Sequence, residues 1–418
     1  MLRSVRRMGQ VSMSIKVAHM MNHDIALRVH GRNYFAYLRE RGYDVHAICS
    51  PGEFVKGDMV TDTGVVVKAI SFPPRYTPGQ DLKTLVQLVC YLREQGYDIV
   101  HTHTAKPGLL GRIAARLAGV PIVIHTVHGF HYWLGMSDLE KRLFVWLERF
   151  AAQFCDLLLS QNREDIGFAV RERICSPEQI HFLGNGIDVT RFRPDAVSPD
   201  AVAAKRRELG IAPDEKVVGM IGRLVRLKGY HEYVQAARLL KERGERIRFL
   251  AIGVAQDQAS VVSPGALISQ YGLQDTMQFL GTRHDIPELI AAMDAVVLAS
   301  YAEGIPRVLL EAAAMGKPAI GTDVRGTREV IVDGETGYLV PPCDALALAD
   351  AISRLSADPA RRREMGRAAR RRAEAHFDER CYFWRTDREY RRLIEVKLSA
   401  SHLRGLKALP LEAGQLPV

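Results

Sequence analysis

Short apolar runs alternate with longer amphipathic stretches from one end of the chain to the other. Runs rich in β-branched residues predict buried strands, and apolar positions three and four residues apart predict helices. Strands that alternate with helices are typical of parallel sheets, so the pattern predicts an α/β fold. In the first half, the expected strands are residues 14–19, 44–49, 64–70, 98–103, 121–126 and 156–160, and the expected helices are 33–41, 81–95, 108–118 and 137–154.

A second series of the same kind follows the turn-rich segment 185–199. The simplest account is two Rossmann-like domains, residues 14–190 and 200–375, that face each other across a cleft. The last amphipathic stretch lies within residues 376–398 and is rich in aromatic residues, and we expect this helix to cross back to the first domain. After residue 398 we expect a loosely ordered tail. The expected strands of the second series are 216–221, 247–252, 277–280, 295–299, 318–321 and 337–340.

The composition agrees with a globular protein of two or three domains. The chain has 418 residues, of which 47% are hydrophobic and 25% charged, which excludes disorder and coiled coil for the chain as a whole. No apolar stretch approaches the ~18 residues that a membrane-spanning helix needs, and the first residues lack the apolar block of a signal peptide. We therefore expect a cytoplasmic protein. The six cysteines include no CxxC pair, so we expect reduced thiols rather than disulfides or a zinc ribbon.

The net charge narrows the class of ligand. Lysine and arginine together number 57 and aspartate and glutamate 48, which leaves a formal charge of +9. Such a surface attracts anions, for which the candidates are nucleic acid, acidic lipid headgroups and a phosphorylated small substrate. Charge alone does not choose among them.

The most specific motif begins Glu303-Gly304-Ile305-Pro306 and reaches a second carboxylate at Glu311. A strand feeds a short loop and then a helix opened by the proline, so free backbone N–H groups point at the edge of the sheet and favour an anion. The two carboxylates are placed to accept hydrogen bonds from hydroxyls at opposite ends of one ligand. The plainer alternative is one glutamate that caps its own helix and another that is exposed.

A second motif, Gly222-Arg223 with Lys228 five residues on, follows the expected strand 216–221. An arginine fork and a lysine point charge together neutralise the two phosphates of a departing diphosphate, a task that a metal ion often performs. The sequence has no Asp-x-Asp pair of the kind that holds such a metal. Taken alone, a basic pair after a strand is typical of solvated surface.

These two motifs together closely resemble the retaining glycosyltransferases of family 4, which use nucleotide sugars and have the GT-B fold of two Rossmann-like domains. The resemblance covers residues 14–394. It implies that Glu303 contacts the transferred sugar and that Glu311 contacts the ribose hydroxyls. It also implies that Arg223 and Lys228, beside Gly222, contact the diphosphate.

The same resemblance assigns further donor contacts. The string 279–283, which includes Gly281, Thr282 and Arg283, is expected near the base. The backbone of Gly304, Ile305 and Pro306 is expected to meet the sugar and the phosphate.

Three histidines, His125, His128 and His131, follow the expected strand 121–126. The family resemblance implies that His128 is the active-site histidine beside the donor sugar. Spacing of three favours a metal only on a helix, and a strand followed by a loop turns the imidazoles to different sides, so we expect no metal here. A lone loop histidine is also typical of a structural residue.

The string HTHTAKPGLLGR, which contains His103 and Lys106, lies where a strand gives way to a helix. It resembles the acceptor domain of family members that build capsular, O-antigen or exopolysaccharide units on polyprenyl diphosphate. By this resemblance His103 and Lys106 are acceptor-site candidates, and Lys106 with the helix N-terminus would meet an acceptor phosphate. A plain turn between strand and helix explains the string equally well.

Two further segments bear on phosphate and membrane contact. Many family members carry paired glycines in the loop after the first strand, whereas residues 20–32 here contain only Gly31, so the contact between the first domain and phosphate is left open. Residues 131–134, with Lys141, Arg142 and 144–146, mix rings and cations as a membrane-surface element does, although core packing explains the rings as well. A polyprenyl-linked acceptor would make transient contact with an anionic membrane useful.

The sequence therefore predicts a retaining glycosyltransferase that moves a sugar from a nucleotide diphosphate donor, expected to be UDP-linked, to a lipid-linked saccharide for a cell-surface polysaccharide. No cofactor, no metal and no nucleic acid partner are expected. The alternatives are a nucleotide-sugar 2-epimerase of the same architecture and a non-catalytic protein that binds nucleotide sugar or RNA. A dehydrogenase is disfavoured because neither half opens with GxGxxG.

Overall fold

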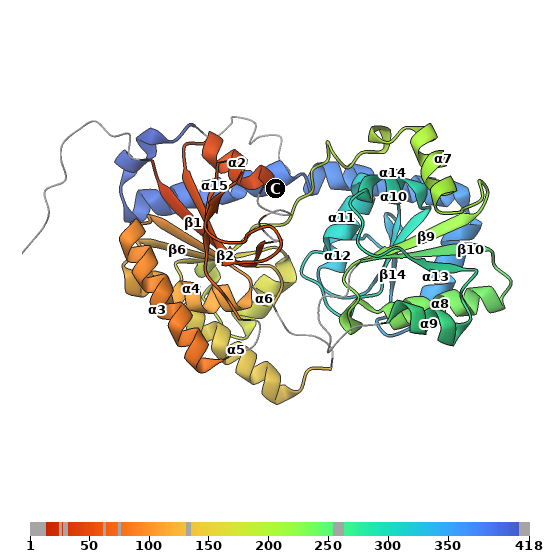
Figure 1. The fold of residues 1–418 in the computed structure, drawn as a ribbon, viewed down its shortest axis with the longest axis horizontal. Helices are drawn as coiled ribbons and strands as arrows, with labels where there is room; N and C mark the ends of the chain where they lie inside the picture. Colours follow the sequence, from red (N-terminus) through yellow and green to blue (C-terminus); the bar gives the residue numbers. More distant parts are fainter. Residues whose placement is uncertain are drawn as a thin grey trace, which may run out of the picture.

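A computed structural model describes residues 14–24, 27, 32–61, 64–73, 77–130, 135–253 and 263–408. It contains two α/β domains side by side, each a twisted sheet covered by helices on both faces (Figure 1). The predicted fold class is confirmed. Strands β5, β6 and β7 are buried along their whole length, as the strands of a parallel sheet with two covered faces must be.

The sheet of the first domain has eight strands in the order β3-β4-β2-β1-β5-β6-β7-β8. All neighbours are parallel except β3 and β4. The strands are β1 (Lys16–His23), β2 (Asp44–Ser50), β3 (Met59–Val60), β4 (Val66–Ala69), β5 (Ile99–His103), β6 (Ile122–Val127), β7 (Leu157–Ser160) and β8 (Ile180–Phe182). The helices are α2 (Arg32–Glu40), α3 (Pro78–Gln95), α4 (Ala105–Ala118), α5 (Asp138–Ala152) and α6 (Arg163–Arg171).

The sheet of the second domain has six parallel strands in the order β11-β10-β9-β12-β13-β14. Counted within the domain, this is the Rossmann order 3-2-1-4-5-6. The strands are β9 (Lys216–Ile221), β10 (Ile247–Ile252), β11 (Met277–Phe279), β12 (Ala295–Leu298), β13 (Ala319–Thr322) and β14 (Gly337–Val340). The helices are α7 (Pro199–Glu208), α8 (Tyr230–Glu242), α9 (Pro264–Tyr271), α10 (Ile286–Ala292), α11 (Arg307–Ala314), α12 (Thr327–Val330), α13 (Ala345–Ala357) and α14 (Pro359–His376).

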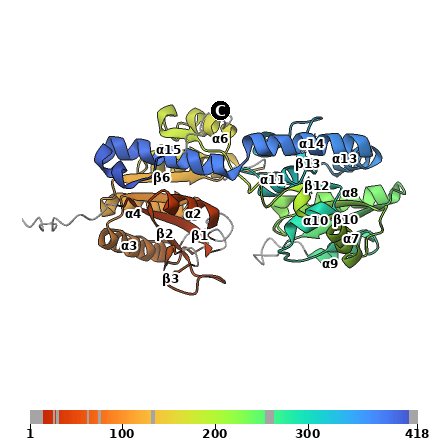
Figure 2. The ribbon, with the colours of Figure 1, turned by 90° about the horizontal axis from the view of Figure 1, so that it is seen from above.

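The last long helix, α15 (Glu379–Lys397), leaves the second domain and lies along the first, whereas α14 stays with the second (Figure 2). Its apolar face belongs to the same core cluster as β1, β5 and β6. The Tyr43 hydroxyl donates to Asp387 of α15 at 2.6 Å. At the crossing, Ile187 of the first linker pairs with the backbone at Asp378, so the two connections between the domains run side by side.

The tail departs from expectation. Residues Ala400–Gly405 form a 3-10 helix, and Leu406 is buried in the core of the first domain. The prediction of a loose tail directly after residue 398 is therefore wrong, because an apolar residue beyond it anchors the chain. Among the described residues, no helix is both long and apolar enough to cross a membrane.

Candidate active site

Each sheet reverses its strand order once, and ligands of open α/β sheets bind in the crevice beyond the carboxyl ends of the strands at that point. In the first domain this switch point lies between β1 and β5, and in the second between β9 and β12. The predicted site residues follow β5, β6, β9, β11 and β12. The two crevices open toward the space between the domains.

The two charged motifs meet at the switch point of the second domain. The Lys228 ammonium lies 2.5 Å from a carboxylate oxygen of Glu303, and both side chains are mostly buried. The loops that carry them touch, because the Tyr301 amide donates to the Leu227 carbonyl at 2.9 Å. A side chain at Gly229 would come within 2.0 Å of the Ala299 carbonyl oxygen, so only glycine allows this approach.

The remaining donor candidates lie along the same edge. The amide of Gly253, at the end of β10, donates to the Gly281 carbonyl at 2.9 Å, and a Cβ at Gly253 would lie 1.7 Å from the Gly222 carbonyl oxygen. Gly222 and Gly281 are therefore brought together. Arg223 and Thr282 beside them are exposed to solvent.

Arg283 is held in an ion-pair network. Its guanidinium contacts Asp285 at 2.6 Å and Glu208 of α7 at 2.7 Å. The Arg283 fork is thus occupied by carboxylates, and the expectation that the string 279–283 lies near the base stays a prediction.

Helix α11 begins one residue later than predicted. Pro306 is its N-cap rather than its first residue, and Ile305 is buried in the core beneath it. Glu311, one helical turn beyond Arg307, accepts a hydrogen bond from the Arg307 Nε at 3.2 Å. Burial raises the pKa of Glu311, and the nearby Arg307 opposes this shift.

The two domains touch where the glutamate loop meets the histidine loop. A Cβ at Gly304 would lie 1.8 Å from the His128 carbonyl oxygen, and the Asn162 side chain donates to the Gly304 carbonyl at 3.3 Å. Nearby, Arg325 of the second domain pairs with Asp165 of the first at 2.9 Å, with both side chains buried. His128 therefore lies beside the loop that carries Glu303.

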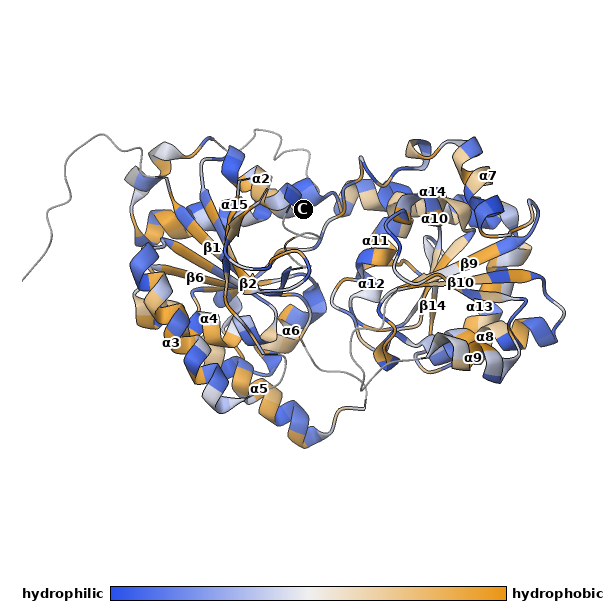
Figure 3. Ribbon diagram, viewed as in Figure 1, coloured by the Kyte–Doolittle hydropathy of each residue, from blue (hydrophilic) through white to orange (hydrophobic). Residues whose placement is uncertain are grey.

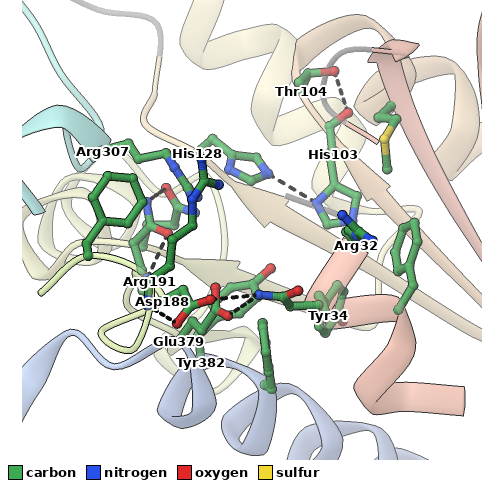
Figure 4. Close-up of a pocket in the computed structure, with 18 residues that line it drawn as sticks. Arg32, Tyr34, His103, Thr104, His128, Asp188, Arg191, Arg307, Glu379 and Tyr382 are labelled. Carbon is green, nitrogen blue, oxygen red and sulfur yellow. Dashed lines mark hydrogen bonds between the residues drawn. The ribbon is translucent and has the colours of Figure 1, made fainter. Parts of the chain in front are cut away.

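A cavity of about 700 Å³ opens between these elements (Figure 4). His103 and His128 line it, together with the guanidinium groups of Arg32, Arg191 and Arg307. Acidic groups line it as well, and Glu379 there accepts a hydrogen bond from Asn33 at 2.6 Å. Sequence reasoning did not single out these three arginines, although Arg307 lies inside the motif 303–311.

The surroundings of Lys106 differ from the expectation that this lysine meets an acceptor phosphate. Its side chain is 7% exposed, and its ammonium lies 2.6 Å from Asp81 of α3 and 2.7 Å from the Pro73 carbonyl oxygen. A lysine buried against a carboxylate is a structural ion pair, so this geometry does not support contact with an acceptor phosphate. His103, in contrast, does line the cavity.

The surroundings of His125 and His128 differ, which agrees with the expectation that these histidines turn to different sides. The His125 Nδ1 lies 2.9 Å from the Thr102 hydroxyl inside the domain, whereas the His128 Nε2 lies 3.1 Å from the His103 Nδ1. His131 falls outside the described residues. Sequence reasoning missed that His19 and His101 adjoin His103, so that ring nitrogens of the three lie within 4.8 Å of one another. Only the parallel pairing of β1 with β5 brings them together.

In the predicted membrane-surface segment, some side chains of helix α5 are buried in the domain and others are exposed. Phe144 packs against Phe130 inside the domain, and Val145 is buried. Along α5, apolar residues alternate with hydrophilic ones (Figure 3), and four of its apolar side chains are exposed. They are Leu139, Leu143, Trp146 and Phe150.

Two Rossmann-like domains that face each other across a cleft, with charged and imidazole groups at its edges, form the GT-B architecture of glycosyltransferases. The solved structure of HepE from Anabaena in complex with UDP-glucose has the same fold, with a TM-score of 0.75 and 23% sequence identity over 90% of this chain and 99% of that one.

Family models and relatives identify the family. Residues 28–191 match the model of Glycosyltransferase Family 4, and residues 202–372 match that of glycosyl transferases group 1. The chain is 32% identical to the UDP-Gal:α-D-GlcNAc-diphosphoundecaprenol α-1,3-galactosyltransferase of Escherichia coli, over 78% of this chain and 83% of that enzyme. It is 27% identical to the capsular polysaccharide biosynthesis glycosyltransferase CapM of Staphylococcus aureus, over 87% and 94%. The chain belongs to glycosyltransferase family 4.

Proposed function

We propose that this glycosyltransferase moves a hexose or N-acetylhexosamine from a UDP-linked donor to a lipid-linked saccharide, with retention of the anomeric configuration, in the synthesis of a cell-surface polysaccharide. The observation that carries the proposal is the Lys228–Glu303 pair at the switch point of the second sheet, beside His128 of the first domain. A cation for phosphate and a carboxylate for sugar hydroxyls thus pair at the loop that meets the backbone of His128, and His128 itself lines the cavity.

In the proposed reaction, the bond between the anomeric carbon and the phosphate oxygen of the donor breaks. The acceptor hydroxyl oxygen bonds to the same carbon, and its proton passes to the departing phosphate. Negative charge grows on the diphosphate, and Arg223 and Lys228 stabilise it there. The Lys228 ammonium has three N–H donors, so it can bond Glu303 and a phosphate oxygen together.

The other donor contacts are proposed as follows. Glu311 accepts from the ribose, and Glu303 and His128 hydrogen-bond sugar hydroxyls. The backbone at Gly304 and Pro306 meets sugar and phosphate. The exposed residues Gly281 and Thr282 lie beside the base, and Gly222, which is brought close to Gly281, lies beside the diphosphate.

The proposed transfer needs no metal ion, because the two cations neutralise the leaving group. Turnover is expected to be unchanged by a chelator such as EDTA. A loss of turnover that Mg²⁺ or Mn²⁺ restores would contradict this assignment.

A lipid diphosphate is the proposed acceptor anchor. The name of the Escherichia coli relative describes a diphosphoundecaprenol-linked acceptor. Since Lys106 is taken by Asp81, the cations proposed for the acceptor phosphates are Arg32, Arg191 and Arg307, which line the cavity. The exposed apolar face of α5, with Lys141 and Arg142 on the same helix, supports transient contact with an anionic membrane surface.

A panel of nucleotide sugars tests the reaction. Release of nucleoside diphosphate is measured with and without a membrane extract that contains lipid-linked acceptors, and the product anomer is determined by NMR. We expect release from one UDP-sugar that depends on the extract, with retention at the anomeric carbon. Conversion of the donor sugar without acceptor would instead identify a 2-epimerase, and salt-sensitive RNA binding without turnover would identify a binding protein.

A further inference from the structure

A second cavity lies in the second domain, at the end of helix α11 that is farther from the cleft. Its volume is about 570 Å³. One wall is helix α14, which Figure 2 shows at the edge of the domain, and the other is the turn after α11 with Pro194 of the first linker. Arg307, at the start of α11, lines the cleft, whereas Gly316 lines this second cavity. At 1.5 Å per residue these two positions are about 13 Å apart along the helix, so the cavities are separate.

The charged residues that line this second cavity are all cations. Of its eight described lining residues, five are basic and three carry no charge. We call the cavity the α14 groove. A concave surface lined by charges of one sign concentrates ions of the opposite sign, so the groove attracts anions. The five basic residues are Lys317, Arg363, Arg367, Arg370 and Arg371.

The seven arginines of α14 fall into two groups. Arg363, Arg367 and Arg371 are exposed, and none of them has a hydrogen bond or an ion pair with another described residue. The other four have partners at 2.6–3.2 Å: Arg361 with Glu364, Arg362 with Asp294, Arg370 with Glu374, and Arg372 with the Glu329 carbonyl oxygen. Because Glu364 and Glu374 are the only carboxylates of α14, both acidic groups of the helix are already paired.

The three unpartnered arginines form a stripe along one face of α14. They lie four residues apart, which places successive members about 6 Å apart along the helix axis. Like charges at this spacing repel each other, and a bound anion would remove the repulsion. Each guanidinium presents a fork of N–H donors that matches two oxygens of one phosphate. The stripe therefore suits several phosphate groups in a row better than a single one.

The opposite wall of the groove adds a fixed positive charge. The Lys317 ammonium donates to the carbonyl oxygens of Ala291 and Met293 at 2.8 and 2.7 Å. Carbonyl groups hold this ammonium in place but do not neutralise it. The two walls are packed closely, because a Cβ at Gly366 of α14 would lie 2.1 Å from the Gly316 carbonyl oxygen. The groove is therefore formed before any ligand binds.

We infer that the α14 groove binds phosphate groups, carried either by a soluble anion with two or more phosphates or by the headgroups of an anionic membrane. Arg363, Arg367 and Arg371 donate to the phosphate oxygens, and Lys317 adds positive charge. This site goes beyond the proposed function, because it lies outside the cleft and takes no part in the sugar transfer.

The test removes the three phosphate ligands together. The groove variant carries Arg363→Gln, Arg367→Gln and Arg371→Gln. The matched control removes three exposed cations at scattered positions on α3, α6 and α7, and carries Lys83→Gln, Arg171→Gln and Arg207→Gln. The two variants lose the same charge, so they separate an effect of the groove from an effect of the net charge.

Two probes distinguish the sources of phosphate. Binding of inorganic pyrophosphate is measured by calorimetry in saturating UDP, which keeps the cleft occupied. Co-sedimentation with vesicles of equal parts phosphatidylglycerol and phosphatidylcholine measures binding to a membrane. We expect the wild type and the control to bind one of these probes, and the groove variant to bind it about tenfold or more weakly. Loss of pyrophosphate binding identifies a soluble anion, and loss of vesicle binding alone identifies lipid headgroups.

The groove variant should keep the circular dichroism spectrum and the UDP affinity of the wild type, because the changed side chains are exposed and lie outside the cleft. If the wild type binds neither probe, or if the groove variant and the control bind both equally, the stripe is only a solvated helix face and the proposal is overturned. Neither measurement needs turnover, so the result is independent of the proposed reaction.

Discussion

The switch points of the two sheets share one topology but differ in chemistry. In the second domain, the segments that follow β9 and β12 carry charged groups, and Lys228 and Glu303 pair across the point. In the first domain, β1 and β5 carry neutral imidazoles, and among the described residues the cations near them come from α2, the linker and α11. None of the three histidines of the second domain is buried.

This difference matches the two ends of a nucleotide sugar. Phosphates are charged throughout the reaction and gain charge as the bond breaks, so fixed cations serve them. The groups on a hexose or N-acetylhexosamine are neutral, and neutral imidazoles hydrogen-bond the hydroxyls without the cost of burying a charge. The fold supplies two similar crevices, and the residues at each edge decide what each one binds.

The largest expected difference between the two domains is the loss of their stability in acid. The buried histidines of β1, β5 and β6 have lowered pKa values, so below pH 6.5 the unfolded state binds more protons than the folded state. Their contribution to stability is complete above pH 6.5 and is lost progressively as the pH falls toward the pKa of each histidine in the folded state, which is about 3 for His19. Between pH 7 and 5.5 each costs about 1 kcal/mol of unfolding free energy.

Hydrogen–deuterium exchange, read separately for each domain, measures this loss. We expect protection of β1, β5 and β6 to fall several hundredfold or more between pH 7 and 5.5 after correction for intrinsic rates, and protection of β9 and β12 to change much less. The ion-paired Asp285 of the second domain, whose pKa is lowered chiefly by its bond to Arg283, loses its contribution only below pH 4. Equal losses in both domains would contradict the contrast.

The next largest effect concerns the charged switch point. Lys228→Ala should lower turnover by about 100-fold, because one preorganised cation is lost from the leaving group and Glu303 is left unpaired. Steady-state release of nucleoside diphosphate measures this. Arg207→Ala, at an exposed position on α7, is the control, and near-normal turnover of Lys228→Ala would show that this lysine does not serve the diphosphate.

A third test disturbs the contact between the two domains at Gly304. Gly304→Ala would place a Cβ 1.8 Å from the His128 carbonyl oxygen, a backbone atom that cannot move independently. Overpacking of this kind costs about 1–3 kcal/mol, so we expect kcat/KM to fall roughly tenfold while the circular dichroism spectrum is unchanged. Gly79→Ala, where a Cβ meets nothing within 4 Å, provides the comparison. Full activity of Gly304→Ala would mean that the domains do not touch here during turnover.

The smallest effect concerns the surface of the first domain. Leu143 on α5 and Leu346 on α13 are similarly exposed, at 57% and 54%. If α5 contacts the membrane, Leu143→Ala should weaken binding to anionic liposomes about threefold, and Leu346→Ala should not. Co-sedimentation at low salt measures both, and equal behaviour of the two variants would remove α5 from the membrane contact.

The sequence predicted the fold well where strands are long and buried. Residues 216–221, 247–252 and 337–340 are strands as predicted, because buried parallel strands read as continuous apolar runs. Strands β3 and β8, of two and three residues, were not predicted, because neither lies within an apolar run long enough to mark a strand.

The site was predictable where residues lie in recognisable motifs. Lys228 and Glu303 were expected at one ligand because the two motifs that carry them resemble those of family 4. The partners of Lys106 and Arg283 were not, because Asp81 and Glu208 come from separate helices that only the packed fold brings near. The contact between the His19 ring and the Tyr390 hydroxyl was missed for the same reason, since Tyr390 lies 371 residues further along the sequence.

Calorimetric titration of UDP tests most directly whether the charged residues of the second domain, and not the histidines of the first, bind the diphosphate. We expect Lys228→Ala to weaken UDP binding at least tenfold, whereas His103→Asn, which alters only the histidines of the first domain, should leave it within about twofold of the wild type. The opposite pattern, with UDP affinity insensitive to Lys228 and lost in His103→Asn, would contradict the account.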